Sequence, residues 1–128
     1  MTVVIDAAAL MCLLLDERGA DQVLPVLRGS IMSAVNLSES FSRSVERGAT
    51  LEAVDQTVRR FEVDVRAFTA ADALDAAKLR PGTKHVGASL GDRACLALAQ
   101  RLSLPMFTAD TRLGRLTGSL PIDIRLIR

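Results

Sequence analysis

Four carboxylate residues are spaced so that an α/β fold would bring them into one shared cleft. They are Asp6, Glu39, Asp92 and Asp110. Asp6 and Asp110 each follow an apolar run, which places them at the carboxyl ends of predicted buried strands, where α/β proteins bind their ligands. Glu39 and Asp92 lie in helical segments expected to pack beside those strands. Because no Lys or Arg is expected inside the cluster, its charge favours a bound divalent cation and predicts a metal-dependent enzyme.

Such a cluster is suited to phosphodiester chemistry. Mg²⁺ and Mn²⁺ prefer oxygen ligands and commonly bind through a few carboxylates, water and substrate phosphate. A bound ion lowers the pKa of a water molecule and orients it for in-line attack, and a second ion stabilises the leaving oxygen. His85 is the only histidine and lies in a predicted loop, so the sequence does not favour a Ser-His-Asp triad.

Each acidic residue also has a purely structural interpretation. Asp92 could complete a capping box with Ser89 and interact with the helix dipole. Glu39 could be an exposed residue of an amphipathic helix, and Asp6 and Asp110 could cap the helices that follow them. Taken singly, these interpretations are sufficient. Only the joint placement of the four favours a site.

The elements that must position these residues alternate along the chain. The predicted strands cover residues 2–6, 30–33, 62–66, 105–109 and 122–126. The predicted helices cover residues 7–15, 20–27, 34–47, 51–60, 70–79 and 90–102, with a short one near 112–116, and residues 81–87 are predicted to form a loop. This alternation predicts one α/β domain, a parallel sheet with helices on both faces.

Composition narrows the class of protein. A chain of 128 residues is expected to form one domain, and a formal net charge of +1 says little about partners. The apolar run at 7–15 is too short to span a bilayer, and no targeting segment is visible, so a cytoplasmic protein without membrane association is expected. Cys12 and Cys95 lack metal-site spacing and are expected to be buried, reduced thiols.

Four segments together resemble the PIN-domain ribonucleases, in particular the small VapC-type toxins of toxin–antitoxin pairs. The matching segments are residues 3–10, 33–39, 89–99 and 104–110. They occur in the family's order, with family-like spacing, over essentially the whole length. The resemblance implies a sheet of about five parallel strands flanked by helices, and a single PIN domain over residues 1–128.

The resemblance also assigns the acidic residues as a catalytic, metal-binding set for Mg²⁺ or Mn²⁺. It implies that Asp6 and Asp92 are the most direct ligands, whereas Glu39 and Asp110 bind a second ion or hold metal-bound water. Ala7, Ala8 and Ala9 occupy positions where family members often carry a hydroxyl, and residues 111–114, where many members carry a further acidic or polar residue, are Thr, Arg, Leu and Gly. We therefore expect the first metal site to be kept and the second to be weak or filled only with RNA bound.

Three further polar residues match family positions near the pocket. Ser33 and Thr108 are expected to donate hydrogen bonds to the carboxylates, although closing strand ends against the backbone explains them equally well. Asn36 also matches, with capping or turn chemistry as its alternative.

The implied substrate is RNA, cleaved endonucleolytically. Arg93 and Arg112 follow Asp92 and Asp110 closely and are predicted to contact RNA phosphates at the cleft mouth, although a solvated surface role is as plausible. Because the chain has four Phe and no Tyr or Trp, base stacking is not expected to dominate recognition. The resemblance implies a small antitoxin as partner, docked along helices 7–15 and 34–47, and a homodimer.

Two other functions remain open from the sequence. A catalytically silent PIN-like domain could serve as a protein- or RNA-binding module. A receiver-like phosphate-handling domain is disfavoured, because it would need an acidic pair after the first strand and a late Lys.

Overall fold

Fourteen short elements alternate along the chain, and the computed structural model describes residues 1–128. The strands are β1 (Val4–Ile5), β2 (Ile31–Ser33), β3 (Asp64–Arg66), β4 (Met106–Thr108) and β5 (Ile124–Leu126). The helices are α1 (Ala7–Leu14), α2 (Ala20–Leu27), α3 (Ala34–Glu46), α4 (Leu51–Arg60), α5 (Ala70–Lys78), α6 (Arg80–Thr83), the 3₁₀ turn η1 (Lys84–Val86), α7 (Leu90–Leu102) and α8 (Thr111–Gly114). The strand order is β3-β2-β1-β4-β5 and every pair is parallel. The predicted fold class is confirmed.

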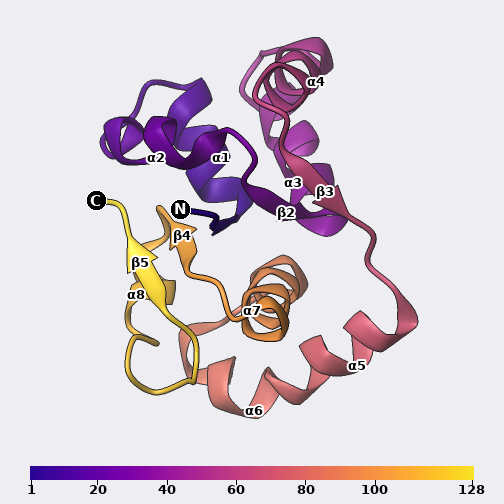
Figure 1. Cartoon of the computed structure of the whole chain (residues 1–128), viewed down its shortest axis with the longest axis vertical. Helices are drawn as coiled ribbons and strands as arrows, with labels where there is room; N and C mark the ends of the chain where they lie inside the picture. Colours follow the sequence, from indigo (N-terminus) through magenta and orange to yellow (C-terminus); the bar gives the residue numbers. More distant parts are fainter.

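The two faces of the sheet are covered by different helices, as side-chain alternation along the strands requires. Val4 and Met106 point to one face, where they pack with residues of α7. Val3, Ile5 and Phe107 point to the other, where α1, α2 and α4 cover them. Figure 1 shows α5, α6 and α7 on one side of the sheet and α1 and α2 on the other. Helix α3 packs against both α1 and α7 and so closes one edge.

One predicted segment differs from the structure. Residues 81–87 are not an extended loop but form most of α6 followed by η1. Pro81 is compatible with this because a proline in the first helical turn lacks only an N–H that would have no helical partner. The buried Thr83 hydroxyl donates to the carbonyl of Leu79 at 2.7 Å, and Gly87 ends the segment in the left-handed region with φ +66°.

Other element boundaries shift by a few residues. The predicted strand at 62–66 begins only at Asp64, because Glu62 adopts a positive φ of 52° at the end of the turn after α4. None of the helices combines the length and hydrophobicity needed to span a membrane.

Candidate active site

The strand order brings the predicted acidic residues to one edge of the sheet. Strand β1 lies between β2 and β4, with Ile5 paired to Phe107. After β1 the chain forms β2 and β3 on one side of β1, and it later forms β4 and β5 on the other side. The strand order therefore reverses between β1 and β4. This is where open α/β sheets form their ligand crevice. Asp6 directly follows β1, and Asp110 lies two residues after β4.

Asp6 is the most buried carboxylate of the set. It is 3% exposed, and its Oδ1 accepts a 2.8 Å hydrogen bond from the backbone N–H of Ala9, capping α1. Its Oδ2 accepts a short hydrogen bond from the Thr108 hydroxyl on β4. Burial raises the pKa of Asp6 to about 7, against the lowering effect of these two hydrogen bonds and with help from the negative charges of Asp92 and Asp110. Asp6 is therefore about half protonated at neutral pH unless a cation lies beside it.

Asp92 caps α7 and also lies near Asp6. It forms a capping box with Ser89, whose backbone N–H donates to Oδ2 at 2.8 Å, while the Asp92 N–H donates to the Ser89 hydroxyl at 3.2 Å. The residue is only 8% exposed. Its charge acts on Asp6, so the capped carboxylate also belongs to the acidic cluster.

Glu39 reaches the same place from α3. Asn36, one turn earlier, donates through Nδ2 to Glu39 Oε1 at 3.0 Å and to the Gly91 carbonyl at 3.1 Å. The Glu39 carboxylate rests directly on Gly91, since a Cβ there would overlap it and lie 2.5 Å from Cδ. Gly91 thus provides the space that lets Glu39 lie next to the first turn of α7.

Arg112 provides a positive charge inside the cluster, which corrects the expectation that it would contain none. Its Nη2 lies 2.7 Å from Asp110 Oδ2 and 3.4 Å from Asp92 Oδ2, while Nη1 donates to the Gly87 carbonyl at 3.2 Å. Burial alone would raise the pKa of Asp110, but side-chain and backbone hydrogen bonds from Arg112 hold that pKa below its usual value. Arg112 therefore neutralises part of the cluster when no metal is bound.

Two other predicted residues lie differently from expectation. The Ser33 hydroxyl accepts from the backbone N–H of Val35 at 3.2 Å, in keeping with the alternative that it closes the strand end against the backbone, and it forms no hydrogen bond to a carboxylate. Arg93 donates through Nη1 to the carbonyl of Ala76 in α5 at 3.2 Å, and its Nε is buried without a partner. Its predicted place at the cleft mouth is corrected, because the side chain runs along the α5–α7 contact.

The Cys95 thiol lies near three of the carboxylates. This thiol is buried on α7, and burial followed by the charges of Asp6, Asp92 and Glu39 raises its pKa well above the usual value. The thiol stays protonated and is no nucleophile. Cys12 is also free and buried, so both thiols are as predicted.

The residues suit a hard divalent cation by their chemistry. Carboxylate oxygens predominate, and Asn36 Oδ1 is a buried acceptor without a hydrogen-bond partner. The elevated pKa of Asp6 shows that its negative charge is poorly compensated. As the side chains stand, no three acidic, His or Cys groups form a ready-made cage. These oxygen donors are thus suited to bind an ion, but two of the carboxylates, Asp92 and Asp110, are paired with Arg112.

Sequence reasoning missed two features beside the cluster. Gly91, next to Asp92, has no chemistry of its own to attract attention. Arg43, Arg47 and Arg128 line a pocket near Ala8, and they come from elements far apart in the sequence. The spacing of four residues between Glu39 and Arg43 was the one available signal, because such residues are neighbours on a helix.

The fold of this chain is shared by a known protein family and by solved structures. The PIN domain profile matches residues 3–118. A toxin–antitoxin complex from Klebsiella pneumoniae contains a chain with a TM-score of 0.74 and 20% identity, covering 98% of both chains. VapC20 of Mycobacterium tuberculosis, a sarcin–ricin loop cleaving toxin, gives a TM-score of 0.71 with 16% identity, covering 94% of this chain and 98% of that one. No curated protein matches the sequence.

Proposed function

Because the chain belongs to the PIN domain family, we propose that it is a metal-dependent endoribonuclease and acts as the toxin of a toxin–antitoxin pair. The observation that carries the proposal is that Asp6, Glu39, Asp92 and Asp110 lie near one another at the carboxyl ends of β1 and β4. A cluster made mainly of carboxylates suits a cation and a phosphate rather than an apolar ligand. The solved structures of toxins with this fold add support.

The residues divide into ligands and supports. Asp6 and Asp92 are proposed to hold Mg²⁺ or Mn²⁺ most directly, with Glu39 and Asp110 at the sides. A bound ion would activate a water molecule for attack on an RNA phosphodiester. Thr108 orients the carboxylate of Asp6 through its hydroxyl.

A second ion is proposed to bind weakly. Asp110 already shares its Oδ2 with Arg112, and Ala7, Ala8 and Ala9 offer no hydroxyl after Asp6. A phosphate of bound RNA could draw the Arg112 guanidinium away from Asp110. Arg112 would then contact RNA, as the sequence suggested, only in the complex.

The decisive experiment is cleavage of mixed cellular RNA by the purified protein. We expect cleavage with Mg²⁺ or Mn²⁺, none in EDTA, and a reduction on the order of 10²–10³-fold in the Asp92→Asn variant. Cleavage that persists in EDTA would exclude the metal mechanism. A protein that binds RNA or a partner without cleaving would be the silent PIN-like module, which the neutralisation of the acids by Arg112 makes a reasonable second candidate.

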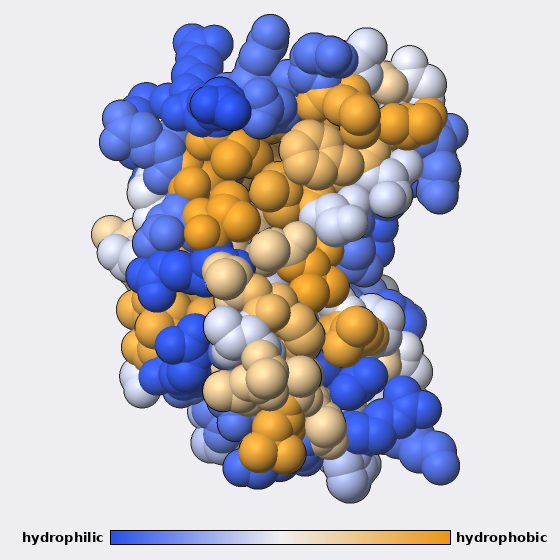
Figure 2. Space-filling view, turned by 90° about the vertical axis from the view of Figure 1, so that its right-hand side faces the viewer, coloured by the Kyte–Doolittle hydropathy of each residue, from blue (hydrophilic) through white to orange (hydrophobic).

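A protein partner is part of the proposal. Figure 2 shows hydrophobic residues gathered on the face that carries β3, α4 and α5. Leu51 on α4 and Leu74 on α5 are 50% and 59% exposed. Exposed apolar side chains on one face favour burial by another protein. We propose that an antitoxin or a second copy of the chain covers it, and that the protein works in the cytoplasm.

Gly91→Ala should separate activity from stability. The new methyl group would overlap the Glu39 carboxylate and push it away from Asp92. We expect RNA cleavage to fall roughly 10- to 100-fold, in line with the loss of a supporting contact in a metal site. The free energy of unfolding should change by no more than about 1 kcal/mol, because alanine is the better helix former.

Gly82→Ala is the matched control for this variant. Gly82 also lies in a helix, and its added Cβ would meet only Leu120 Cδ2 at 3.4 Å. Cleavage rates and thermal unfolding of both variants check the prediction. Full activity in Gly91→Ala would show that the position of Glu39 does not matter.

A further inference from the structure

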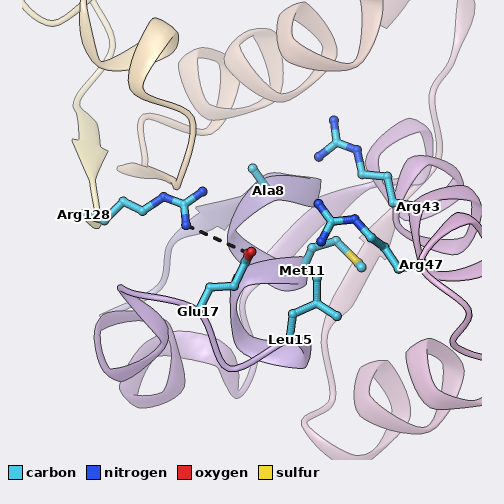
Figure 3. A pocket seen from close by; sticks show the side chains of 7 residues that line it. All are labelled: Ala8, Met11, Leu15, Glu17, Arg43, Arg47 and Arg128. Atoms are coloured by element: carbon cyan, nitrogen blue, oxygen red, sulfur yellow. Dashed lines mark ion pairs between the residues drawn. The ribbon is translucent and has the colours of Figure 1, made fainter.

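A pocket lined by three arginines lies beside the acidic cluster. Arg43 projects from α3 and Arg47 from the residue that follows it, while Arg128, two residues after β5, enters on the opposite side, above α1 (Figure 3). The pocket has a volume of about 120 Å³. Its apolar floor is formed by Ala8, Met11 and Leu15. The arrangement therefore combines a partly open pocket with positive charge at its rim.

The positive charge in this pocket is only partly compensated. Glu17 is the one acidic residue of the lining, and it lies 3.9 Å from Arg128 Nη1. Arg43 Nη2 lies 3.9 Å from Glu39 Oε2, which is the outer limit of an ion pair. No ion pair holds Arg47, which is exposed. Three guanidinium groups facing so little negative charge are suited to bind an anion.

The pocket is joined to the acidic cluster through its own residues. Arg128 Nε donates to the carbonyl of Ala109 at 3.0 Å, and Ala109 immediately precedes Asp110. The positive charge of Arg43 contributes to lowering the pKa of Asp110. An anionic chain bound at the carboxylates would therefore have the arginine pocket beside it.

We propose that Arg43, Arg47 and Arg128 bind a phosphate of the RNA strand next to the one that is cleaved. The inference rests on the proposed ribonuclease function and names a subsite for its substrate. Guanidinium groups match phosphate oxygens in a bidentate manner. Because the floor offers no side-chain hydrogen-bonding group and no aromatic ring, the subsite reads backbone charge and not base identity.

RNA binding in EDTA tests the subsite without any cleavage. The probe is a fluorescein-labelled single-stranded RNA 12-mer, and anisotropy is measured over a range of salt concentrations. The plot of log Kobs against log salt should lose up to about 0.7 of its slope, the value for one phosphate contact on a single strand, and Arg47→Gln and Arg43→Gln should each lose part of this amount. The double variant should lose more than either single one, and its KM for RNA cleavage should rise.

Arg101→Gln is the matched control. Arg101 and Arg43 are each 46% exposed and each lies near one acid, but Arg101 is at the far end of α7 from Asp92. Nine residues of helix separate Arg101 from the acidic cluster by roughly 14 Å. The salt dependence of this variant should equal that of the wild type.

The outcomes distinguish the subsite from the function on which it rests. If the wild type cleaves RNA but the Arg43 and Arg47 variants behave as Arg101→Gln does, the subsite is wrong and the ribonuclease stands. If the wild type neither binds nor cleaves RNA, both are wrong. A hexaglutamate peptide serves as a competitor of RNA. If the double variant loses peptide binding but still binds RNA, the pocket binds an acidic protein instead of RNA.

Discussion

Asp6→Asn is expected to stabilise the metal-free protein while abolishing RNA cleavage. The pKa of Asp6 is about 7 in the folded chain against an ordinary value of 3.8. Holding this side chain ionised in its buried place therefore costs about 4 kcal/mol at pH 8. Asparagine removes that charge and keeps the shape, but it gives up the hydrogen bond from Thr108, worth about 1 kcal/mol. The net gain should be about 2–3 kcal/mol.

The gain should depend on pH in a defined direction. The unfolded chain loses the Asp6 proton near pH 3.8, whereas the folded chain retains it until about pH 7. Stability of the wild type therefore falls as pH rises through this interval and levels off above it. At pH 5 the cost of Asp6 is only about 2 kcal/mol, so the advantage of the variant should shrink by a similar amount between pH 8 and pH 5.

Thermal unfolding in EDTA measures this difference. A gain of 2–3 kcal/mol corresponds to a rise of roughly 10 °C in the midpoint at pH 8. Mn²⁺ should raise the midpoint of the wild type much more than that of the variant, because only the wild type gains a ligand from the ionised carboxylate. Asp123→Asn is the control, since it removes an exposed charge paired with Arg125 and should change little. A variant less stable than the wild type at pH 8 would show that Asp6 is not an uncompensated charge.

The fold could be derived from the sequence because its signals are local. Apolar runs of strand length alternate with amphipathic stretches, and this fixes the parallel sheet with its helices on either face. The segment 81–87 was the exception, because proline and glycine are common to loops and to short helical turns. The hydrogen bond from the Thr83 hydroxyl and the packing of Val86 in the core stabilise the helical turn. Neither contact can be predicted from local composition.

The acidic site could be predicted by position, but its internal contacts could not. The positions of Asp6 and Asp110 could be predicted from the strands that precede them. The carboxyl ends of neighbouring parallel strands lie at the same edge of the sheet, so the two residues come close together. The contact of the Glu39 carboxylate with Gly91 depends on how α3 packs against α7, which cannot be predicted from a local sequence pattern. The position of the Arg93 side chain along α5 likewise depends on how two helices pack, in this case α5 and α7. Long side chains follow tertiary packing, so arginines were the least predictable residues of the site.

Arg112→Gln should strengthen metal binding and weaken the metal-free fold. The Arg112 guanidinium bridges Asp110 and Asp92, where a divalent ion would place its own charge. Removing the competing cation should raise the affinity for Mn²⁺ about tenfold, which corresponds to 1.4 kcal/mol. In EDTA the variant should lose about 1 kcal/mol of stability, a modest value because the side chain is 44% exposed and its ion pairs are screened by solvent.

Arg125→Gln is a closely matched control for this variant. Arg125 follows Asp123 at the same two-residue spacing, pairs with it at 2.9 Å and is 45% exposed, but the pair lies at the amino end of β5 rather than in the cluster. Electron paramagnetic resonance of free Mn²⁺ measures affinity without any dependence on cleavage. If Arg112 acts only by contacting RNA, Mn²⁺ affinity will be equal in the wild type and both variants, and only the KM for RNA will rise in Arg112→Gln. An increase in Mn²⁺ affinity confined to Arg112→Gln would instead identify Arg112 as the charge that occupies the cluster until metal and RNA replace it.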